Sequence, residues 1–365
     1  MKETYDVVIV GAGCGGLYLS QLLGKERLRV CVVESKKDLL NLSFHTLGSF
    51  IDLNYFGLTR NVVASDIGEC VFHSRDLHSK KTIKGYILNK VELHKELIAK
   101  TLSHGIIIRT STKIVGFKAD PKGILECLID GSGNEFFAKV FVDASGLSGV
   151  LSKRLGIQAG KTKTAVGLEY NAEYLGQQNQ AHLFIGKSFA GGYGWIFPQG
   201  NRRAIIGYGS FHQESVARLK QKLDVAIAKE PIKSLIKVDN NINYGGTIPI
   251  TDVNRKLVYK NVLCVGDSVS QVNPLVGEGY RFIMQAASIA GPYIVKCIRE
   301  NNLRSLNGYE TEWLKRFEKA YIKSKRLQTI ANIASKSDVL SNCAVWFVGK
   351  CTDKMVQKTL SADFA

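Results

Sequence analysis

The first 34 residues constrain the fold of this chain more than any other stretch. The apolar run Val7–Val10 predicts a buried strand, a turn of six residues (Gly11-Ala12-Gly13-Cys14-Gly15-Gly16) follows, and a helix pattern then continues to about Leu23. A second strand, residues 29–33, ends in Glu34. A strand, Gly-x-Gly-x-x-Gly, a helix, a strand and an acid in this order predict the β-α-β unit that binds the ADP half of a dinucleotide.

The residues of this unit have separate physical tasks. We expect Gly11 to permit the tight turn, Gly13 to let the backbone approach a pyrophosphate, and Gly16 to let the helix pack closely on the strand. The free N–H groups at the start of the helix face the phosphates. Glu34, 18 residues after Gly16, is placed to accept hydrogen bonds from ribose hydroxyls. A carboxylate there repels a 2′-phosphate, which disfavours NADP as the ligand of this unit.

Two later stretches repeat the pattern of a buried strand that ends in small residues. Residues 136–142 predict a strand that leads into Asp143-Ala144-Ser145-Gly146. A strand over residues 256–265 leads into Gly266-Asp267, a loop to Gly279, and a long helix over residues 280–300. Since this last unit lies so late in the chain, we expect the chain to return to its first domain.

The middle of the chain has the alternation of an antiparallel sheet. Strands are predicted at residues 164–171, 181–186, 193–198 and 203–209, followed by a helix over residues 212–229. We expect this sheet to form the wall of a substrate cavity. Residues 50–88 mix short apolar runs with polar turns and are expected to belong to the same second layer. A further helix is predicted over residues 91–103, with Leu93, Leu97, Ile98 and Leu102 on its apolar face.

Composition limits the class of protein. A chain of 365 residues with 45% apolar residues and six prolines is long enough for about two compact domains. No run approaches the ~18 apolar residues that span a bilayer, and the start of the chain does not resemble a signal peptide. Eight cysteines without a Cys-x-x-Cys pair favour a reducing, cytoplasmic location, with Cys14, Cys31, Cys127 and Cys264 as reduced core residues. No metal site is predicted.

The formal charge of +17 is compatible with two interpretations. It favours an anionic partner such as an acidic membrane surface or a phosphorylated substrate, or it reflects a solvated, lysine-rich surface. Residues 313–336 carry seven Lys or Arg against one Glu and predict a basic amphipathic helix. That helix either rests on an anionic membrane or packs on the body with a solvated basic face. Nucleic-acid binding is not expected, because no recognition motif accompanies the charge.

The three glycine-containing elements together resemble the FAD-dependent oxidoreductases of the para-hydroxybenzoate hydroxylase fold. The stretch Tyr193-Gly194-Trp195-Ile196-Phe197-Pro198, followed by Gly207-Tyr208-Gly209, is similar to the Tyr-x-Trp-x-Phe-Pro pattern of the geranylgeranyl reductase family. The resemblance covers about residues 1–300. It implies an α/β protein with a Rossmann-like FAD-binding domain, a mostly antiparallel substrate domain and C-terminal helices.

The resemblance also implies a division of the chain and a set of site residues. Residues 1–48, 89–155 and 255–310 are expected to form the FAD-binding domain, residues 49–88 and 156–254 the substrate-binding domain, and residues 311–365 a helical tail. The expected FAD-binding residues are Gly11, Gly13, Cys14, Gly15, Gly16, Glu34, Ser35, Lys90, Ala144, Ser145, Gly146, Gly266, Asp267, Pro274, Gly277, Glu278, Gly279 and Tyr280. The expected substrate-binding residues are Tyr193, Trp195 and Phe197, and the catalytic candidates are His45 and Glu278.

Two positions depart from the family pattern. The segment after the second strand lacks the family's cysteine, and the next cysteine, Cys70, is far along the chain. Lys90 stands where the family has a pyrophosphate-facing arginine; it keeps the charge and loses the bidentate fork.

The function implied is the reduction of carbon–carbon double bonds in an isoprenoid or prenyl lipid by reduced FAD. Electrons would come from NAD(P)H or a ferredoxin-like donor that docks transiently, and the protein would be cytoplasmic or peripheral on the membrane. A flavin-dependent monooxygenase or halogenase, and a lycopene-cyclase-like enzyme without net redox change, are alternatives. A non-catalytic flavoprotein that docks on membranes or nucleic acid through its basic tail is an alternative of another class.

Overall fold

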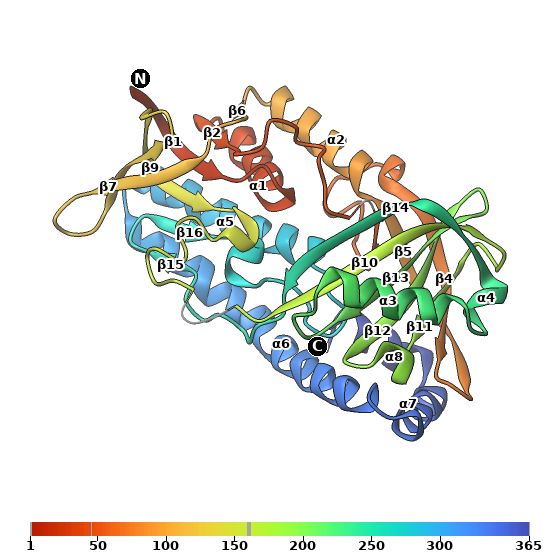
Figure 1. Ribbon diagram of the computed structural model, residues 1–365. Coiled ribbons are helices and arrows are strands. Elements are labelled where there is room, and N and C mark those ends of the chain that lie inside the picture. Colours follow the sequence, from red (N-terminus) through yellow and green to blue (C-terminus); the bar gives the residue numbers. More distant parts are fainter. Residues whose placement is uncertain (1, 45, 159–161, 365) are drawn as a thin grey trace.

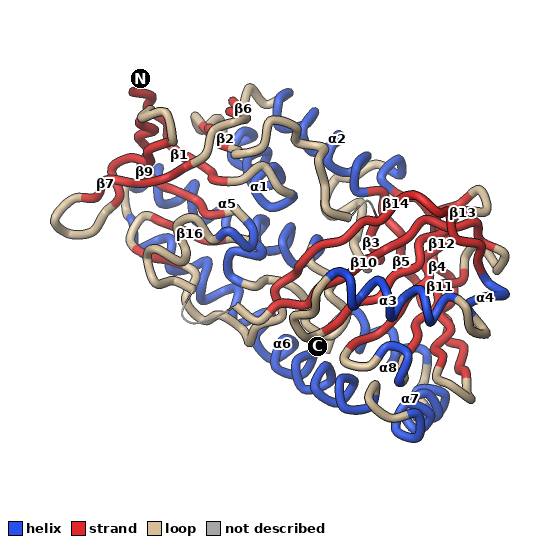
Figure 2. Tube along the Cα trace, in the orientation of Figure 1, coloured by secondary structure: helices blue, strands red, loops and turns tan. Residues whose placement is uncertain are grey.

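The computed structural model, which describes residues 2–44, 46–158 and 162–364, contains two eight-stranded sheets with helices around them (Figures 1 and 2). The strands are β1 (Lys2–Val10), β2 (Val30–Val33), β3 (Thr46–Ser49), β4 (Val63–His73), β5 (His78–Asn89), β6 (Ile107–Arg109), β7 (Ile114–Ala119), β8 (Leu125–Asp130), β9 (Glu135–Asp143), β10 (Thr164–Tyr174), β11 (Gln180–Phe184), β12 (Gly192–Gly200), β13 (Arg203–Ser210), β14 (Ile236–Pro249), β15 (Val258–Tyr259) and β16 (Val262–Cys264). The helices are α1 (Cys14–Lys25), α2 (Lys90–Ser103), α3 (Val216–Ile227), α4 (Ile232–Leu235), α5 (Tyr280–Glu300), α6 (Asn307–Ala334), α7 (Asp338–Lys350) and α8 (Asp353–Ser361).

The first sheet has the order β15-β16-β9-β1-β2-β6, with the β7–β8 hairpin paired to β9. The pairs β16–β9, β9–β1, β1–β2 and β2–β6 are all parallel. Val10 lies opposite both Val33 and Asp143, and Asp143 lies opposite Cys264. The carboxyl ends of four strands therefore form one edge, and the loop after each strand starts from that edge.

Helices α1, α2 and α5 pack around this sheet and close its core. Leu93 and Leu97 of α2 are fully buried, as the helical spacing predicts, and Ile98 is partly buried. Leu102 is 54% exposed, so the predicted apolar face is one turn shorter than the sequence indicated. In this last turn the residue that faces α1 is Thr101, which is buried and donates to the Leu17 carbonyl (3.2 Å), and the next side chain along the helix points outwards.

The second sheet has the order β14-β10-β13-β12-β11-β4-β5-β3. Its pairs are antiparallel except for β11–β4, which is parallel. One face packs under α3, where Leu219 and Leu223 meet Leu168 and Tyr170 of β10. Figure 2 shows α3 lying across this sheet. The residues of β10 between these two, such as Glu169, point to the opposite face.

The structure corrects the predicted strands in two places. The single strand expected over residues 256–265 is a short hairpin of β15 and β16, because Lys260 adopts a positive φ of 53° and the Asn261 side chain bonds the backbone of Leu125 instead of continuing a strand. Strand β14 was not predicted, because its run of asparagines and glycines lacks an apolar alternation and is ordered by pairing with β10.

The C-terminal helices are integral to the body. Trp313, Tyr321 and Gln328 of α6 are buried, so the interpretation of this segment as a helix packed on the body is confirmed. In Figure 1, α6 runs along the lower side of the molecule from the first sheet towards the second. None of the described helices combines the length and the apolar character needed to cross a bilayer.

Helices α6 and α8 also hold the long loop between β16 and α5. The Tyr321 hydroxyl donates to the Ser270 carbonyl (2.8 Å), and the Gln328 amide donates to the Pro274 carbonyl (2.7 Å). The Asn273 amide donates to the Leu360 carbonyl of α8 (2.9 Å). The loop is thus fixed by elements far downstream of it in the sequence.

Replacing Asp143 by Ala tests the carboxyl edge of the first sheet. The carboxylate is fully buried and accepts hydrogen bonds from the backbone N–H groups of Ser145, Leu151 and Ser152 (2.7–3.0 Å). We expect Asp143→Ala to lower the free energy of unfolding by about 3–5 kcal/mol, because buried donors are left unpaired. Urea denaturation measures this. The control is Asp120→Ala, which removes two similar hydrogen bonds in the turn between β7 and β8. In that turn water can replace the carboxylate, so we expect a smaller loss of unfolding free energy. An equal loss of unfolding free energy in the two variants would contradict the argument.

Candidate functional site

The glycine-rich turn after β1 has the close contacts that its predicted task requires. Gly11 has φ +108°, and a Cβ built on it would lie 2.4 Å from the Ala144 carbonyl oxygen. A Cβ on Gly16 would lie 2.0 Å from the Gly11 carbonyl oxygen. At Gly13, by contrast, no described atom lies within 4 Å of a built Cβ, so its outer side is free for a ligand. The turn is compact towards the protein and open outwards.

Glu34 lies beside this turn. Its Oε2 accepts a hydrogen bond from the Ala12 N–H (2.9 Å), and its Oε1 accepts from the Ser35 hydroxyl (3.0 Å) and the Lys36 N–H (2.9 Å). These bonds fix the carboxylate next to the glycine turn while Ser35 stays close to the surface. The arrangement suits the ribose contact that the sequence predicts.

The other two small-residue motifs reach the same edge of the sheet. Ala144 lies against Gly11, and the Ser145 hydroxyl and N–H both donate to Asp143. Gly266 has φ +82° and follows β16, the strand beside β9. Asp267 is partly buried, burial raises the pKa of its carboxyl to about 6, and its buried Oδ1 has no hydrogen-bond partner among the described residues. A buried acceptor or donor of this kind requires a partner, which a bound cofactor can supply.

Lys90 begins α2 and lies between the two sheets. Its Nζ is 5.2 Å from the centre of the Tyr280 ring, and burial lowers the pKa of its ammonium to about 8. Tyr280 in turn shares a 2.9 Å hydrogen bond with the His94 ring.

Cys14 is buried at the start of α1, where burial raises the pKa of its thiol well above the usual value. Cys31, Cys127 and Cys264 are buried too, as predicted.

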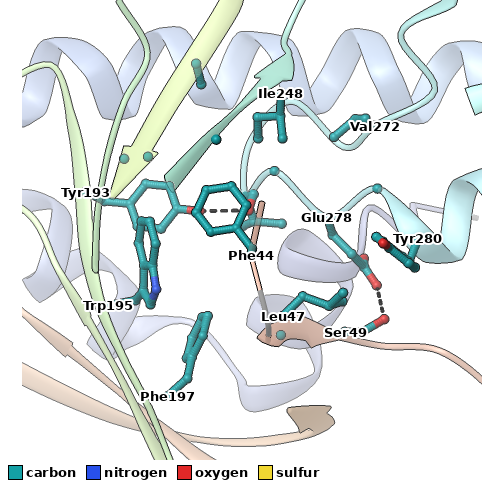
Figure 3. Close-up of a pocket in the computed structure, with 18 of the residues that line it drawn as sticks. Phe44, Leu47, Ser49, Tyr193, Trp195, Phe197, Ile248, Val272, Glu278 and Tyr280 are labelled. Carbon is teal, nitrogen blue, oxygen red and sulfur yellow. Dashed lines mark hydrogen bonds between the residues drawn. The ribbon is translucent and has the colours of Figure 1, made fainter. Parts of the chain in front are cut away.

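A cavity of about 350 Å³ lies between the two sheets (Figure 3). One wall is the face of the second sheet opposite α3; the other is the loop before α5, together with β3 and Lys90. Of the residues singled out in the sequence, the cavity is lined by Lys90, Tyr193, Trp195, Phe197, Asp267, Pro274, Gly277, Glu278, Gly279 and Tyr280. The residues of the glycine turn, with Glu34, Ser35, Ala144, Ser145, Gly146 and Gly266, lie at the strand ends outside it. The site therefore has a polar part at the strand ends and a mostly apolar part between the sheets.

Glycines hollow out the sheet wall of this cavity. Gly246, Gly167 and Gly209 lie in one row across β14, β10 and β13, and the row ends at Tyr193 of β12. The Phe44 ring lies against this row, because a Cβ on Gly246 would be 2.7 Å from it. The row without side chains makes room for two aromatic rings, because a Cβ on Gly167 would lie 3.3 Å from Phe44 and one on Gly209 would lie 3.1 Å from Trp195.

The next row explains the Gly-x-Gly that follows the aromatic strand. Trp195 pairs with Gly207, and Gly207 pairs with Glu169 of β10. The Trp195 indole crosses over Gly207, where a Cβ would lie 2.3 Å from the ring, and its N–H donates to Glu169 Oε1 (3.1 Å). The indole reaches an acid two strands away only because the residue between them is glycine.

Glu169 is a site residue that the sequence analysis missed. It is 4% exposed and lines the cavity, and its Oε2 lacks a partner within the part of the chain that the structure describes. Burial raises the pKa of its carboxyl to about 8, against the opposing effects of the Trp195 N–H and the Lys90 charge. The carboxyl is therefore largely protonated at neutral pH. The sequence signal that could have identified Glu169 is a single acidic residue within the apolar strand predicted over residues 164–171.

Glu278 has a different environment. Its Oε1 accepts from the Ser49 hydroxyl (2.8 Å) and the Phe50 N–H (2.9 Å), and its Oε2 accepts from the Arg281 guanidinium (3.0 Å). Figure 3 shows Glu278 and Ser49 on the side of the cavity opposite Tyr193, Trp195 and Phe197. With its oxygens occupied, Glu278 joins β3 to the start of α5, and these contacts favour a positioning role over the predicted catalytic one.

Three further positions complete the site. His45, the other catalytic candidate, lies outside the described residues. Cys70, distant in the sequence, lines the cavity at the end formed by β4 and β11, and burial raises the pKa of its thiol to about 12. The Tyr193 hydroxyl donates to the Val276 carbonyl (2.7 Å) and so connects the sheet wall to the loop wall. Among the described residues, no group of His, Cys, Asp and Glu side chains is placed to hold a metal ion.

The fold and the site together define a dinucleotide-binding oxidoreductase scaffold with an apolar cavity beside the cofactor region. The chain belongs to the FAD binding domain family, whose profile matches residues 4–324. The glycine turn, Glu34 and Asp267, whose Oδ1 has no partner in the described part of the chain, fit FAD.

The chain is similar to proteins of the branch that the aromatic motif indicated. It is 24% identical over 330 residues to the digeranylgeranylglycerophospholipid reductase of Methanocaldococcus jannaschii, covering 86% of this chain and 83% of that protein. The crystal structure of a geranylgeranyl bacteriochlorophyll reductase-like protein from Thermoplasma acidophilum has a TM-score of 0.89 at 20% identity, covering 99% of this chain and 96% of the other. A probable FAD-dependent monooxygenase from Pseudomonas aeruginosa has a TM-score of 0.69 at 18% identity, covering 94% of this chain and all (100%) of the other. The predicted fold class and family resemblance are confirmed.

Replacing Glu34 by Ala tests the cofactor part of the site. We expect the apoprotein to bind FAD about ten- to a hundredfold more weakly, because charge-assisted hydrogen bonds are lost. Titration of the apoprotein with FAD, followed by flavin fluorescence, measures the Kd. Asp38→Ala, an exposed acid in the same segment whose side chain bonds the Leu40 N–H, is the control. Equal FAD affinity in Glu34→Ala and the unchanged protein would contradict the assignment.

Proposed function

We propose that this protein reduces carbon–carbon double bonds in the isoprenoid chain of a lipid, with FAD as its cofactor. The observation that carries the proposal is the apolar cavity in which an aromatic strand and a buried, largely protonated acid share one wall. An alkene has no polar group to bind, so its recognition depends on shape and apolar contact. The names of the curated relatives, which are reductases of a digeranylgeranylglycerophospholipid, support the same substrate class.

The cavity residues have the task of binding and orienting the prenyl chain. Tyr193, Trp195 and Phe197 give an aromatic wall, and the cavity beside this wall is proposed to hold the chain. Enclosure excludes water, which keeps reducing equivalents from being lost to side reactions. FAD in its reduced state supplies the hydride. We propose Lys90, Asp267 and the residues from Gly277 to Tyr280 as the part of the wall nearest the cofactor.

Glu169 is the proposed proton donor. Addition of a hydride to one alkene carbon requires a proton at the other, and the neutral Glu169 carboxyl faces the cavity to supply it. The Trp195 N–H holds the carboxyl in place and, together with the Lys90 charge, stabilises the carboxylate left after transfer. A proton from solvent then restores the acid. The hydride and the proton together convert the alkene to an alkane.

Other partners complete the proposal. NAD(P)H or a ferredoxin-like protein is the proposed electron donor, docking transiently, and the lipid substrate implies contact with a membrane surface. The substrate-binding part is proposed to comprise residues 49–88 and 156–254, as the sequence indicated.

Replacing Glu169 by Gln tests the proton donor. We expect turnover to fall about a hundredfold, because general acid catalysis is lost, while the flavin spectrum stays unchanged. The rate of the unchanged protein should decline as pH rises through about 8, since an acid with a raised pKa loses its proton there. Glu169→Gln should lack that decline.

The control for this prediction is Glu173→Gln, a half-exposed acid on the same strand that pairs with Arg202. Lys90 and Asp267 also face the cavity and have shifted pKa values, so either group could affect the pH profile. The alkaline decline is therefore assigned to Glu169 only if it is present in the unchanged protein and absent in Glu169→Gln. A pH profile of Glu169→Gln that still declines near the same pH would exclude Glu169 as the acid.

An anaerobic reaction tests the proposed function itself. Protein reconstituted with FAD and chemically reduced is mixed with a detergent-dispersed polyprenyl lipid in the absence of oxygen. We expect the flavin absorbance to return at a rate that rises with lipid concentration. Reoxidation that requires oxygen and proceeds with an unchanged alkene would favour the monooxygenase alternative.

A further inference from the structure

Helix α7 carries its large apolar side chains on the exposed face. Val339, Leu340, Trp346 and Phe347 are 70%, 45%, 57% and 62% exposed, and Cys343 between them is also exposed. Spacings of three, four and seven residues place all five on one side of the helix. We call these five residues the α7 patch.

The opposite face of α7 binds the body of the protein through Val345, which is buried, through Val348, which packs in the cluster around Cys70, and through polar groups. Asp338 pairs with Arg75 (3.3 Å) and accepts from the Lys187 N–H, and the Asn342 amide donates to Asp76 (2.8 Å). A surface helix normally buries its apolar face and exposes its polar one. Helix α7 buries Val345 but leaves a second apolar face exposed, so this second face is available to a partner that is itself apolar.

The charge around the patch defines that partner further. Residues 313–358 contain ten Lys or Arg against three Asp or Glu. Lys336 and Lys350 are exposed at the two ends of α7, and the Lys350 Nζ lies 5.5 Å from the centre of the Trp346 ring. Aromatic residues flanked by lysines are typical of segments that lie in the interface of an anionic bilayer.

Helix α7 also lies near the end of the cavity that Cys70 lines, because Val348 of α7 packs in the same apolar cluster as Cys70. Helices α7 and α8 both contact β5, and β5 contributes Ile83 to the cavity lining. Val356 of α8 packs in the same apolar cluster as Cys70, and Leu360 of α8 lines the cavity itself. Figure 1 shows α7 at the end of the molecule where β4 and β11 lie, away from the first sheet.

We propose that the α7 patch inserts into the interface of an anionic phospholipid bilayer. Docking there would bring the end of the cavity that Cys70 lines close to the membrane that contains the lipid substrate. The docking itself is independent of the chemistry; only the entry of substrate from that membrane rests on the proposed function.

Tryptophan fluorescence tests the insertion directly. The chain has three tryptophans, of which Trp195 and Trp313 are buried, so Trp346 is the one that responds to a change of surroundings at the surface. We expect vesicles of phosphatidylglycerol and phosphatidylcholine to shift the emission to shorter wavelength, and brominated acyl chains to quench it. Pure phosphatidylcholine vesicles should give a much smaller shift.

Variants assign the binding to the patch. In vesicle co-sedimentation we expect the double variant Trp346→Ser and Phe347→Ser to bind at least about tenfold more weakly, because apolar contact is lost. Lys336→Gln and Lys350→Gln should each weaken binding about fivefold. Val216→Ser on α3, which removes an equally exposed apolar side chain from another surface, is the control and should bind like the unchanged protein.

The outcomes separate the proposal from its rivals. Unchanged vesicle binding by the double variant, or no binding by the unchanged protein, would overturn it. A dimer that the double variant converts to a monomer, with no vesicle binding by either, would make the patch an interface between copies and also overturn it. Turnover of detergent-dispersed prenyl lipid should be equal in the double variant and the unchanged protein. If the double variant loses vesicle binding and keeps that turnover, the result supports docking. If the unchanged protein binds vesicles but has no turnover, the result contradicts only the proposed function.

Discussion

The hydrogen bond from the Trp195 indole to the Glu169 carboxyl organises the cavity wall. It spans two strands of the second sheet, and only the absence of a side chain at Gly207 permits it. Burial of an ionised carboxylate is costly, so the enclosed Glu169 keeps its proton near neutral pH. The same contact thus fixes the aromatic wall and places a proton source on the sheet side of a mostly apolar cavity.

The loop between β16 and α5 connects this wall to the cofactor region. It starts at the carboxyl edge of the first sheet with Gly266 and Asp267, and its Val276 carbonyl accepts the Tyr193 hydroxyl of the second sheet. Tyr321 and Gln328 of α6 hold it from behind. The C-terminal helices therefore serve the site as well as the core, which explains why the segment predicted as a tail is packed so closely.

The sequence predicted those features that depend on local patterns. The β1–α1–β2 unit, the strand before Asp143 and helix α5 each carry their signal in consecutive residues. The structure has them at nearly the predicted bounds, except that β1 begins at Lys2, five residues before the predicted Val7. Strand β14 and the role of Glu169 depend on pairing between distant strands, which a single sequence does not display. The contacts of Glu278 likewise come from Ser49 and Phe50, over 200 residues away in the chain. Local periodicity therefore identifies helices and strands, whereas the site depends on which residues of distant strands pair with one another.

The protonation of Glu169 is the claim on which the proposed chemistry depends, and infrared difference spectroscopy measures it most directly. The spectrum of the Glu169→Gln variant is subtracted from that of the unchanged protein, at neutral pH and again at strongly alkaline pH. The structure predicts the carbonyl stretch of a protonated carboxylic acid at neutral pH, replaced by carboxylate bands at alkaline pH. Carboxylate bands alone at neutral pH would show that Glu169 is ionised in the cavity and would contradict its assignment as the proton donor.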